Sequence, residues 1–540
     1  MTKQRKEQLI LCVLAILLWG ITFYTDTKLF TNDPLNMNCL PIDTGMVTLM
    51  HILTKLGVLA LLSGGLFFLR HLMRRPQSLA VFAGLLLIYV AGLLITYPGY
   101  YMSDDPIIFA YATRYYPVYW HNYLTSLFYM IGMSLFPASC GPVLLSDLLY
   151  AAVYTYLFEK TKKCYASKWS YLILLTGILP FTLLGALMCF RPAVYSSFFL
   201  FYFVYLFFEW KEKARLTPLK FIFLSLLTAV LSLWRSESIV LLPLGGILIG
   251  LTYANTESEG EKKHTPFRKT LKKYILFVLA SCVLFTVIKL PQAHGEKTYY
   301  GSDYLIISTT RPLSVIVHRD QTYPGAEEDL ANISAVTDFG YLHNDSLSCS
   351  AYNRYNSDHN EGRYTQTGAD AALQKAYLKS AMRLILHNLD LFFGERLQLF
   401  CVTNGIFDYN QDMVLQLKPV VTTNFHLYDH DRSYGFEMLD AYKRLPVSSH
   451  EGYALSLFRY GGESYIPMLL LLAGLLIYAL CHRQWFLFFC FGTLFAREAV
   501  IFLTAPASFI QYSYPMMYVT AAFFVLLLIE ALCASRTKGR

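Results

Sequence analysis

Residues 79–97 read LAVFAGLLLIYVAGLLITY, a run without a single charged side chain. A helix rises about 1.5 Å per residue, so this run can cross the hydrocarbon core of a bilayer. Similar runs recur along most of the 540 residues, of which 55% are hydrophobic and only 15% are charged. A soluble domain usually has about 25% charged residues. The composition therefore excludes a soluble or disordered protein and predicts an all-α polytopic membrane protein.

The apolar runs predict about twelve membrane-spanning helices. They cover approximately 8–25, 46–69, 79–97, 141–158, 169–189, 193–209, 219–234, 238–253, 274–290, 464–481, 485–504 and 510–532. A further apolar run, 123–136, is short for a span.

The basic residues decide how this short run is placed. Lysine and arginine collect in the cytoplasmic loops of membrane proteins. The basic clusters at 3–6, 70–75, 160–168, 211–220, 262–273 and 536–540 all fall on one side only if 123–136 does not cross. The short loops of the other side then hold only Lys28, Arg114, Arg191 and Arg235. We therefore predict a multi-pass cell-membrane protein with both termini cytoplasmic. An interfacial helix lies in the external loop 98–140, after the third span.

The same reading divides the chain into three parts. Residues 1–290 hold spans one to nine and the external loop, and 464–540 hold the last three spans. Between them, 291–463 is hydrophilic, with mixed charge and turn-forming residues, and predicts a mixed extracytoplasmic domain. Helical periodicity is clear only over 371–389, after Asp370 as N-cap. The net charge of +8 is explained by the cytoplasmic loops, so it does not indicate a nucleic-acid partner.

The most informative polar segment follows the third span and reads YPGYYMSDDP over 97–106. Its two carboxylates, Asp104 and Asp105, are at the predicted membrane surface. A carboxylate there could act as general base on an incoming hydroxyl, and the pair could hold a divalent cation, Mg²⁺ or Mn²⁺. The alternative is that one of them only caps the helix that begins near Pro106.

Other candidate side chains lie in the remaining external segments. Arginine suits the bidentate binding of phosphate, and ionisable residues inside a span usually face a cavity. Tyrosine near a membrane surface can bind a lipid phosphate or a sugar, or can simply belong to the aromatic belt. The alternative for the charged residues is a snorkelling side chain, or an Arg235–Glu237 pair that only seals its turn. The candidate substrate-binding residues are His121, Arg191, Arg235, Glu237, Arg497, Glu498, Tyr512 and Tyr514.

The order of these features resembles that of the lipid-sugar-dependent glycosyltransferases of the C superfamily. It is also similar to bacterial multi-spanning proteins with a Tyr-Pro-Gly…Asp motif and a Tyr-rich Ala-Pro-Ala-Ser turn near the C-terminus. The likeness covers about 79–250 and 490–530. The chain departs from the better-known members in having two spans before the one that precedes the Asp loop. His121-Asn122 also stands where some members have Lys-Pro-Pro.

The resemblance implies a GT-C fold and a transferase that inverts the sugar's configuration. The donor would be a polyprenyl-phosphate sugar, and the acceptor a cell-envelope glycan, lipid or protein on the external face. Asp104 or Asp105 would deprotonate or orient the acceptor hydroxyl. Arg191, Arg235 or Arg497 would stabilise the charge that grows on the departing lipid phosphate.

Three other functions fit parts of the pattern. A polysaccharide polymerase shares the many spans, the large external segment and the external arginines. A transporter or flippase for a lipid-linked saccharide also needs a polar cavity with arginine. It predicts polar residues near midmembrane in repeated halves, whereas ionisable residues here concentrate at the external ends. A non-catalytic assembly protein would not need Asp104 or Asp105.

Overall fold

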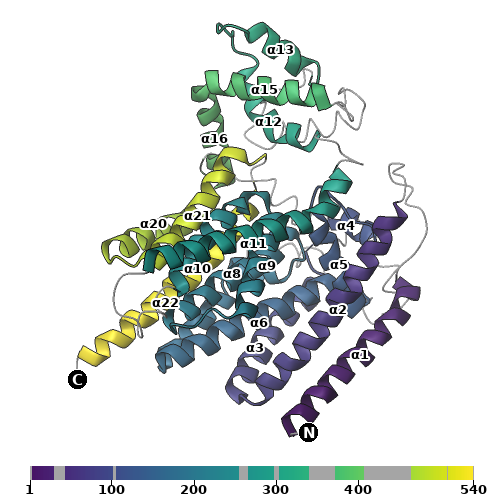
Figure 1. The fold of residues 1–540 in the computed structure, drawn as a ribbon, viewed down its shortest axis with the longest axis vertical. Helices are drawn as coiled ribbons and strands as arrows, with labels where there is room; N and C mark the ends of the chain where they lie inside the picture. Colours follow the sequence, from purple (N-terminus) through teal and green to yellow (C-terminus); the bar gives the residue numbers. More distant parts are fainter. Residues whose placement is uncertain are drawn as a thin grey trace.

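The computed structural model describes residues 3–29, 43–100, 105–253, 266–296, 303–337, 339, 371–404, 406, 464–506 and 509–538. Within these ranges the chain folds into helices and has no β-strand. Most helices form one tilted bundle, and a smaller group stands at one end of it (Figure 1).

The bundle contains the long apolar helices and several shorter segments between them. In chain order its members are α1 (Lys3–Leu29), α2 (Thr44–Met73), α3 (Pro76–Ile95), α4 (Asp105–Ala112), α5 (Tyr123–Leu135), α6 (Gly141–Tyr165), η1 (Lys168–Gly177), α7 (Pro180–Ala186), α8 (Arg191–Lys211), α9 (Pro218–Trp234), η2 (Ser236–Val240), α10 (Leu241–Tyr253), α11 (Pro266–Gly295), α20 (Ile466–Cys481), α21 (Trp485–Thr504), η7 (Ile510–Ser513) and α22 (Tyr514–Lys538).

Nine helices in the described part of the chain are long and apolar enough to cross a membrane, or ten if the bent pair η1–α7 is one span. Two further predicted spans correspond to α9 and α20, which are apolar but shorter. Every predicted span thus falls on a helix of the bundle, and the all-α polytopic class is confirmed. That all twelve cross a bilayer stays a prediction.

The span expected over 169–189 is built from two pieces. The 3₁₀ helix η1 ends at Gly177, α7 begins at Pro180, and the two are bent by 60°. Proline suits the first position of a helix and holds the preceding residue in an extended conformation. Leu179, with φ −59° and ψ 146°, has that conformation.

One end of the bundle gathers the basic clusters, and we call it the basic end. Lys160 pairs with Glu212 at 3.0 Å and Lys211 with Glu530 at 2.8 Å, which ties α6, α8 and α22 together. Arg74 pairs with Glu7 at 2.9 Å across α2 and α1. Both chain termini lie at this end (Figure 1). The basic clusters of the described helices therefore share one end, as their spacing predicts.

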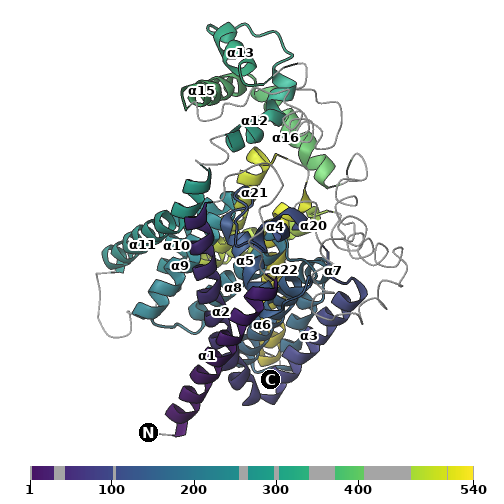
Figure 2. The ribbon, with the colours of Figure 1, turned by 90° about the vertical axis from the view of Figure 1, so that its right-hand side faces the viewer.

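The opposite end carries a helical domain, and we call it the domain end. The domain consists of α12 (Asp303–Ile316), α13 (Ala326–Ser334), α15 (Ala371–His387) and α16 (Leu389–Thr403), and the first three stand away from the bundle (Figure 2). Leu313, Ile333, Tyr377 and Leu384 form its buried core. The helix predicted over 371–389 is thus confirmed as α15, whereas its proposed cap Asp370 lies outside the described residues. In the described part of the predicted mixed domain, the only regular elements are helices, joined by turns such as 317–325.

The short run at 123–136 forms α5, which begins at Tyr123 as predicted. Nine of its thirteen residues are buried, because it packs against α2, α4 and α6. Ile131 lies where a side chain on Gly57 of α2 would stand. The helix is therefore held inside the bundle along much of its surface, and its interfacial orientation stays a prediction.

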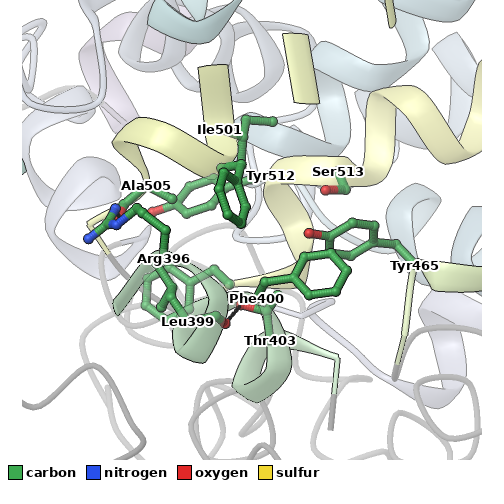
Figure 3. Close-up of a pocket in the computed structure, with 11 residues that line it drawn as sticks. Arg396, Leu399, Phe400, Thr403, Tyr465, Ile501, Ala505, Tyr512 and Ser513 are labelled. Carbon is green, nitrogen blue, oxygen red and sulfur yellow. Dashed lines mark hydrogen bonds between the residues drawn. The ribbon is translucent and has the colours of Figure 1, made fainter. Parts of the chain in front are cut away.

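The helical domain joins the bundle through α16. Arg396 Nη1 donates to the Ala505 carbonyl at 2.7 Å, and the Phe400 ring packs on Tyr465, with centroids 5.7 Å apart. The small cavity between these residues, lined also by Tyr512 and Ser513, has a volume of about 20 Å³ (Figure 3). That is room for about one water molecule, so this cavity belongs to a joint and not to a substrate site.

Candidate functional site

The segment that precedes α5 is tied to two other helices at the domain end. Asn122 Nδ2 donates to the Leu233 carbonyl at the end of α9, at 3.0 Å. Gln292 of α11 donates to the Tyr119 carbonyl at 2.6 Å and accepts from the Tyr123 amide at 2.9 Å. These bonds fix the entrance of α5 between α9 and α11.

Asn122 has an unusual backbone conformation. Its φ of 67° and ψ of 135° lie outside the left-handed helical region that asparagine tolerates. Its side chain also caps α5 by accepting from the Leu124 amide at 3.1 Å. Backbone strain of this kind costs about 1–3 kcal/mol and gathers at functional sites, so it draws attention to the surface that Asn122 lines.

That surface is a cavity of about 340 Å³ at the domain end of the bundle. Its walls combine aromatic rings, amides, hydroxyls and three charged side chains, the mixture expected of a ligand site. The lining residues are Tyr119, Trp120, Asn122, Arg191, Ser232, Leu233, Trp234, Ser236, Ile239, Phe285, Lys289, Gln292 and Glu296.

One predicted residue lines this cavity and a second lies behind its wall. Arg191 begins α8 and lines the cavity. His121 is buried, and its ring packs edge-on against Phe190, the neighbour of Arg191, with centroids 5.6 Å apart. His121 therefore supports the wall from behind and does not line the cavity itself.

The cavity lies beside the lipid-facing surface of the bundle. On α11, Val287 is 56% exposed and Leu290 is 61% exposed, on either side of Lys289. In a membrane such apolar side chains contact acyl chains. A ligand with a charged head and an apolar tail could therefore place the head beside Arg191 and the tail along α11.

The end of α11 is also pinned to the start of α2. His294 Nε2 lies 2.8 Å from Oδ2 of Asp43, the N-cap of α2. The hydrogen bond with His294 lowers the pKa of the Asp43 carboxyl below its ordinary value. α11 ends at Gly295, so it extends past residue 291, where the sequence predicts that the extracytoplasmic domain begins.

Four other candidate residues form a buried ionic network at the Trp234–Ser238 turn. They are Arg235, Glu237, Arg497 and Glu498. Glu237 Oε1 accepts from Arg235 Nε at 2.6 Å and from Arg497 Nη2 at 2.8 Å. Arg497 Nη1 also donates to Glu498 at 3.0 Å, and Ser513 donates to the other oxygen of Glu498 at 2.6 Å. All four charged side chains are at most 9% exposed.

This network places two guanidinium groups against two carboxyl groups. Its arginines are already paired with these carboxyl groups, so it suits a positioning role for the turn that lines the cavity. Arg191 is the one arginine among the residues that line the cavity. Of the three arginines predicted to face a phosphate, only Arg191 has the access that a ligand requires.

The two predicted tyrosines have different surroundings. The ring of Tyr512 lies under Arg235, whose guanidinium carbon is 5.1 Å from the ring centroid. Tyr512 thus joins the ionic network to the joint with the helical domain. Tyr514 points into the bundle, where its buried ring stacks on Tyr518 with centroids 6.1 Å apart. Tyr514 is therefore part of the core and does not join the network.

The predicted Asp pair is described only in part. Asp104 lies outside the described residues. Asp105 is the first residue of α4 and is fully buried, and it lines neither cavity. Since α4 begins at Asp105, this residue belongs to the first turn of the helix. Among the described residues there is no group of three or more metal-ligating side chains.

The sequence did not identify several of the residues that line the cavity. Trp120 reads as a membrane anchor and Lys289 as a snorkelling lysine, whereas both line the cavity. Gln292 carried a usable signal, because an amide buried in the last turns of an apolar helix needs polar partners.

No protein-family model, no curated protein and no solved structure matches this chain.

Proposed function

We propose that the protein is a membrane glycosyltransferase. It would move a sugar from a polyprenyl-phosphate donor to a hydroxyl of an envelope glycan, lipid or protein at the domain end of the bundle. The observation that carries the proposal is the cavity of about 340 Å³ that combines Arg191, aromatic walls and an adjoining lipid-facing helix.

The cavity and its surroundings offer a partner for each of the three parts of such a donor, which are the phosphate, the sugar and the prenyl chain. Arg191 supplies a planar set of donors that suits a phosphate, and Lys289 adds a second positive charge. Trp120 and Trp234 offer flat apolar faces against which a sugar ring can pack. The exposed side of α11 provides a surface for the prenyl chain.

The reaction needs one base and one stabilised leaving group. The acceptor hydroxyl attacks the anomeric carbon and passes its proton to a base, while the bond from that carbon to the phosphate oxygen breaks. Asp104 is the candidate base of the pair, because Asp105 is buried and does not line the cavity. The bond electrons leave with the polyprenyl phosphate, whose growing charge Arg191 stabilises. Attack from the face opposite the leaving group inverts the sugar's configuration.

The buried ionic network supports this site from behind. Glu237 and Arg497 fix the turn that presents Trp234 and Ser236 to the cavity. Rigid walls keep a bound donor in the geometry that the reaction requires. In this proposal Arg235 and Arg497 are positioning residues.

Binding of polyprenyl phosphate to the purified protein tests the role of Arg191. A hydrogen bond to a charged group contributes about 1.5–3 kcal/mol, so Arg191→Gln is expected to raise the Kd roughly tenfold to a hundredfold. Arg191→Lys should lie between this variant and the wild type. Arg319→Gln, which removes an exposed arginine of the helical domain, is the matched control and should bind like the wild type.

Polyprenol without phosphate provides the second arm. It should bind more weakly than polyprenyl phosphate, and Arg191→Gln should not change its affinity. If Arg191→Gln and Arg319→Gln bind polyprenyl phosphate equally well, Arg191 does not hold the phosphate.

A further inference from the structure

A second cavity opens on the flank of the bundle, between α3 and η1. It has a volume of about 430 Å³, and we call it the α3–η1 groove. Except for Gln77 and the Tyr171 hydroxyl, its walls are apolar. The lining residues are Gln77, Ala80, Val81, Gly84, Leu85, Ile88, Tyr171, Leu174, Leu175 and Ile178.

The groove exists because α3 and η1 both pack on α6 and leave space between them. Gly84 lies midway along the α3 wall, and no atom is within 4 Å of the place where its Cβ would stand. Next to Ile88 and Ile178 of the groove wall, the Tyr89 hydroxyl donates to the Gly177 carbonyl at 2.8 Å and joins α3 to η1. Leu175 is 52% exposed, so the groove is open toward the surrounding lipid.

One end of the groove, near the start of α3, lies at the basic end and carries a cation. Lys162 of α6 donates to Gln77 and lies over the ring of Tyr171, with Nζ 5.5 Å from the centroid. Its neighbours Lys160 and Lys163 both pair with Glu212 at 3.0 Å. No carboxylate in the described part of the chain pairs with Lys162.

We propose that the α3–η1 groove binds one acyl chain of an anionic phospholipid whose phosphate pairs with Lys162. The apolar walls match the chain, and the lysine lacks the carboxylate that its neighbours have. A charged headgroup at the basic end supplies that missing charge. This site is at the opposite end of the bundle from the Arg191 cavity, and it does not depend on the proposed transferase activity.

Photo-crosslinking in vesicles tests the proposal. The full chain is reconstituted with phosphatidylglycerol or phosphatidylcholine carrying a diazirine in one acyl chain, and labelled peptides are mapped. Wild type should be labelled within 77–88 and 171–178, and more by phosphatidylglycerol. One lysine near a membrane surface corresponds to about a fivefold preference, which Lys162→Gln should abolish. Lys163→Gln removes an equal charge from a lysine that pairs with Glu212 and does not contact the groove residue Gln77, so it should keep the preference.

A second pair of variants tests the groove itself. Gly84→Leu places a side chain where the added Cβ has open space around it and replaces glycine by a better helix former, so the protein should fold. It should remove most of the labelling at 77–88 and 171–178. Gly474→Leu makes the same change at an open position of α20 outside the groove and should leave the labelling intact.

Three results would overturn the proposal. In the first, both lipids label the wild type equally. In the second, Lys163→Gln loses the preference as fully as Lys162→Gln does. In the third, Gly84→Leu and Gly474→Leu reduce the labelling at these peptides to the same extent.

Discussion

Glu237 shows how a single carboxylate can organise this site. Its Oε1 accepts from Arg235, two positions before it, and from Arg497, 260 positions after it. The three side chains are buried, so water cannot replace a lost partner. The balance of two arginines and two glutamates then decides whether the turn beside the cavity is stable.

Glu237→Gln is therefore expected to destabilise the protein strongly. It leaves one more buried positive charge than negative charge, which costs about 3–5 kcal/mol when a partner is removed from a buried pair. Thermal unfolding in detergent, followed by intrinsic fluorescence, measures this effect. Asp390→Asn breaks the exposed pair with Arg319 and should leave the unfolding temperature unchanged.

A second variant separates lost charge from lost shape. Arg235→Met together with Glu237→Gln removes one charge of each sign, so it should be more stable than Glu237→Gln alone. Equal unfolding temperatures for Glu237→Gln and Asp390→Asn would contradict the role given to the network.

At the scale of elements, the cavity depends on how α5 begins. Asn122 caps this helix from a strained backbone conformation and holds α9 through its side chain. Because the strain belongs to the backbone and the bonds belong to the side chain, different substitutions separate the two.

Asn122→Ala should be less stable than Asn122→Gly by about 1–2 kcal/mol. Both lose the side-chain bonds, but only glycine adopts a positive φ without strain, and glycine is also an acceptable cap. Asn332 in α13 is the control, because at an ordinary helical position glycine should be less stable than alanine by about 1 kcal/mol. Denaturant unfolding of the four variants measures both differences, and the same order at both sites would exclude strain at Asn122.

The sequence predicts the positions of the helices better than the contacts between them. Apolar runs locate the spanning helices because burial in lipid demands such runs, and the charge bias locates one shared end. Pro180 was an available sign of the break between η1 and α7. In contrast, Arg497 meets Glu237 from 260 positions away. The cavity likewise combines α8, α9, α11 and the segment before α5, and periodicity within each helix does not reveal such contacts.

The whole molecule has two chemically different ends. Basic clusters and both termini lie at the basic end, whereas the helical domain and the Arg191 cavity lie at the other. Since lysine and arginine favour the cytoplasmic side, the domain end should face away from the cytoplasm.

Reporter fusions in a bacterial host check this orientation. Green fluorescent protein at the C-terminus should fluoresce, and alkaline phosphatase inserted after Pro324, in the turn between α12 and α13, should be active. The opposite pair of results would reverse the topology and would place the cavity in the cytoplasmic leaflet.

The most direct test of the central claim is a transfer assay in lipid vesicles. Purified protein is offered a panel of polyprenyl-phosphate sugars with envelope glycan extracts, and released polyprenyl phosphate is measured. Wild type should consume one donor. Arg191→Gln should slow release, and Asp104→Asn should lower it about a hundredfold or more, and further than Asp105→Asn does, while the protein stays folded. Chelation with EDTA, followed by Mg²⁺ or Mn²⁺, shows whether the Asp pair needs a metal. If no donor is consumed, or if all three variants match the wild type, the protein is not the transferase proposed here.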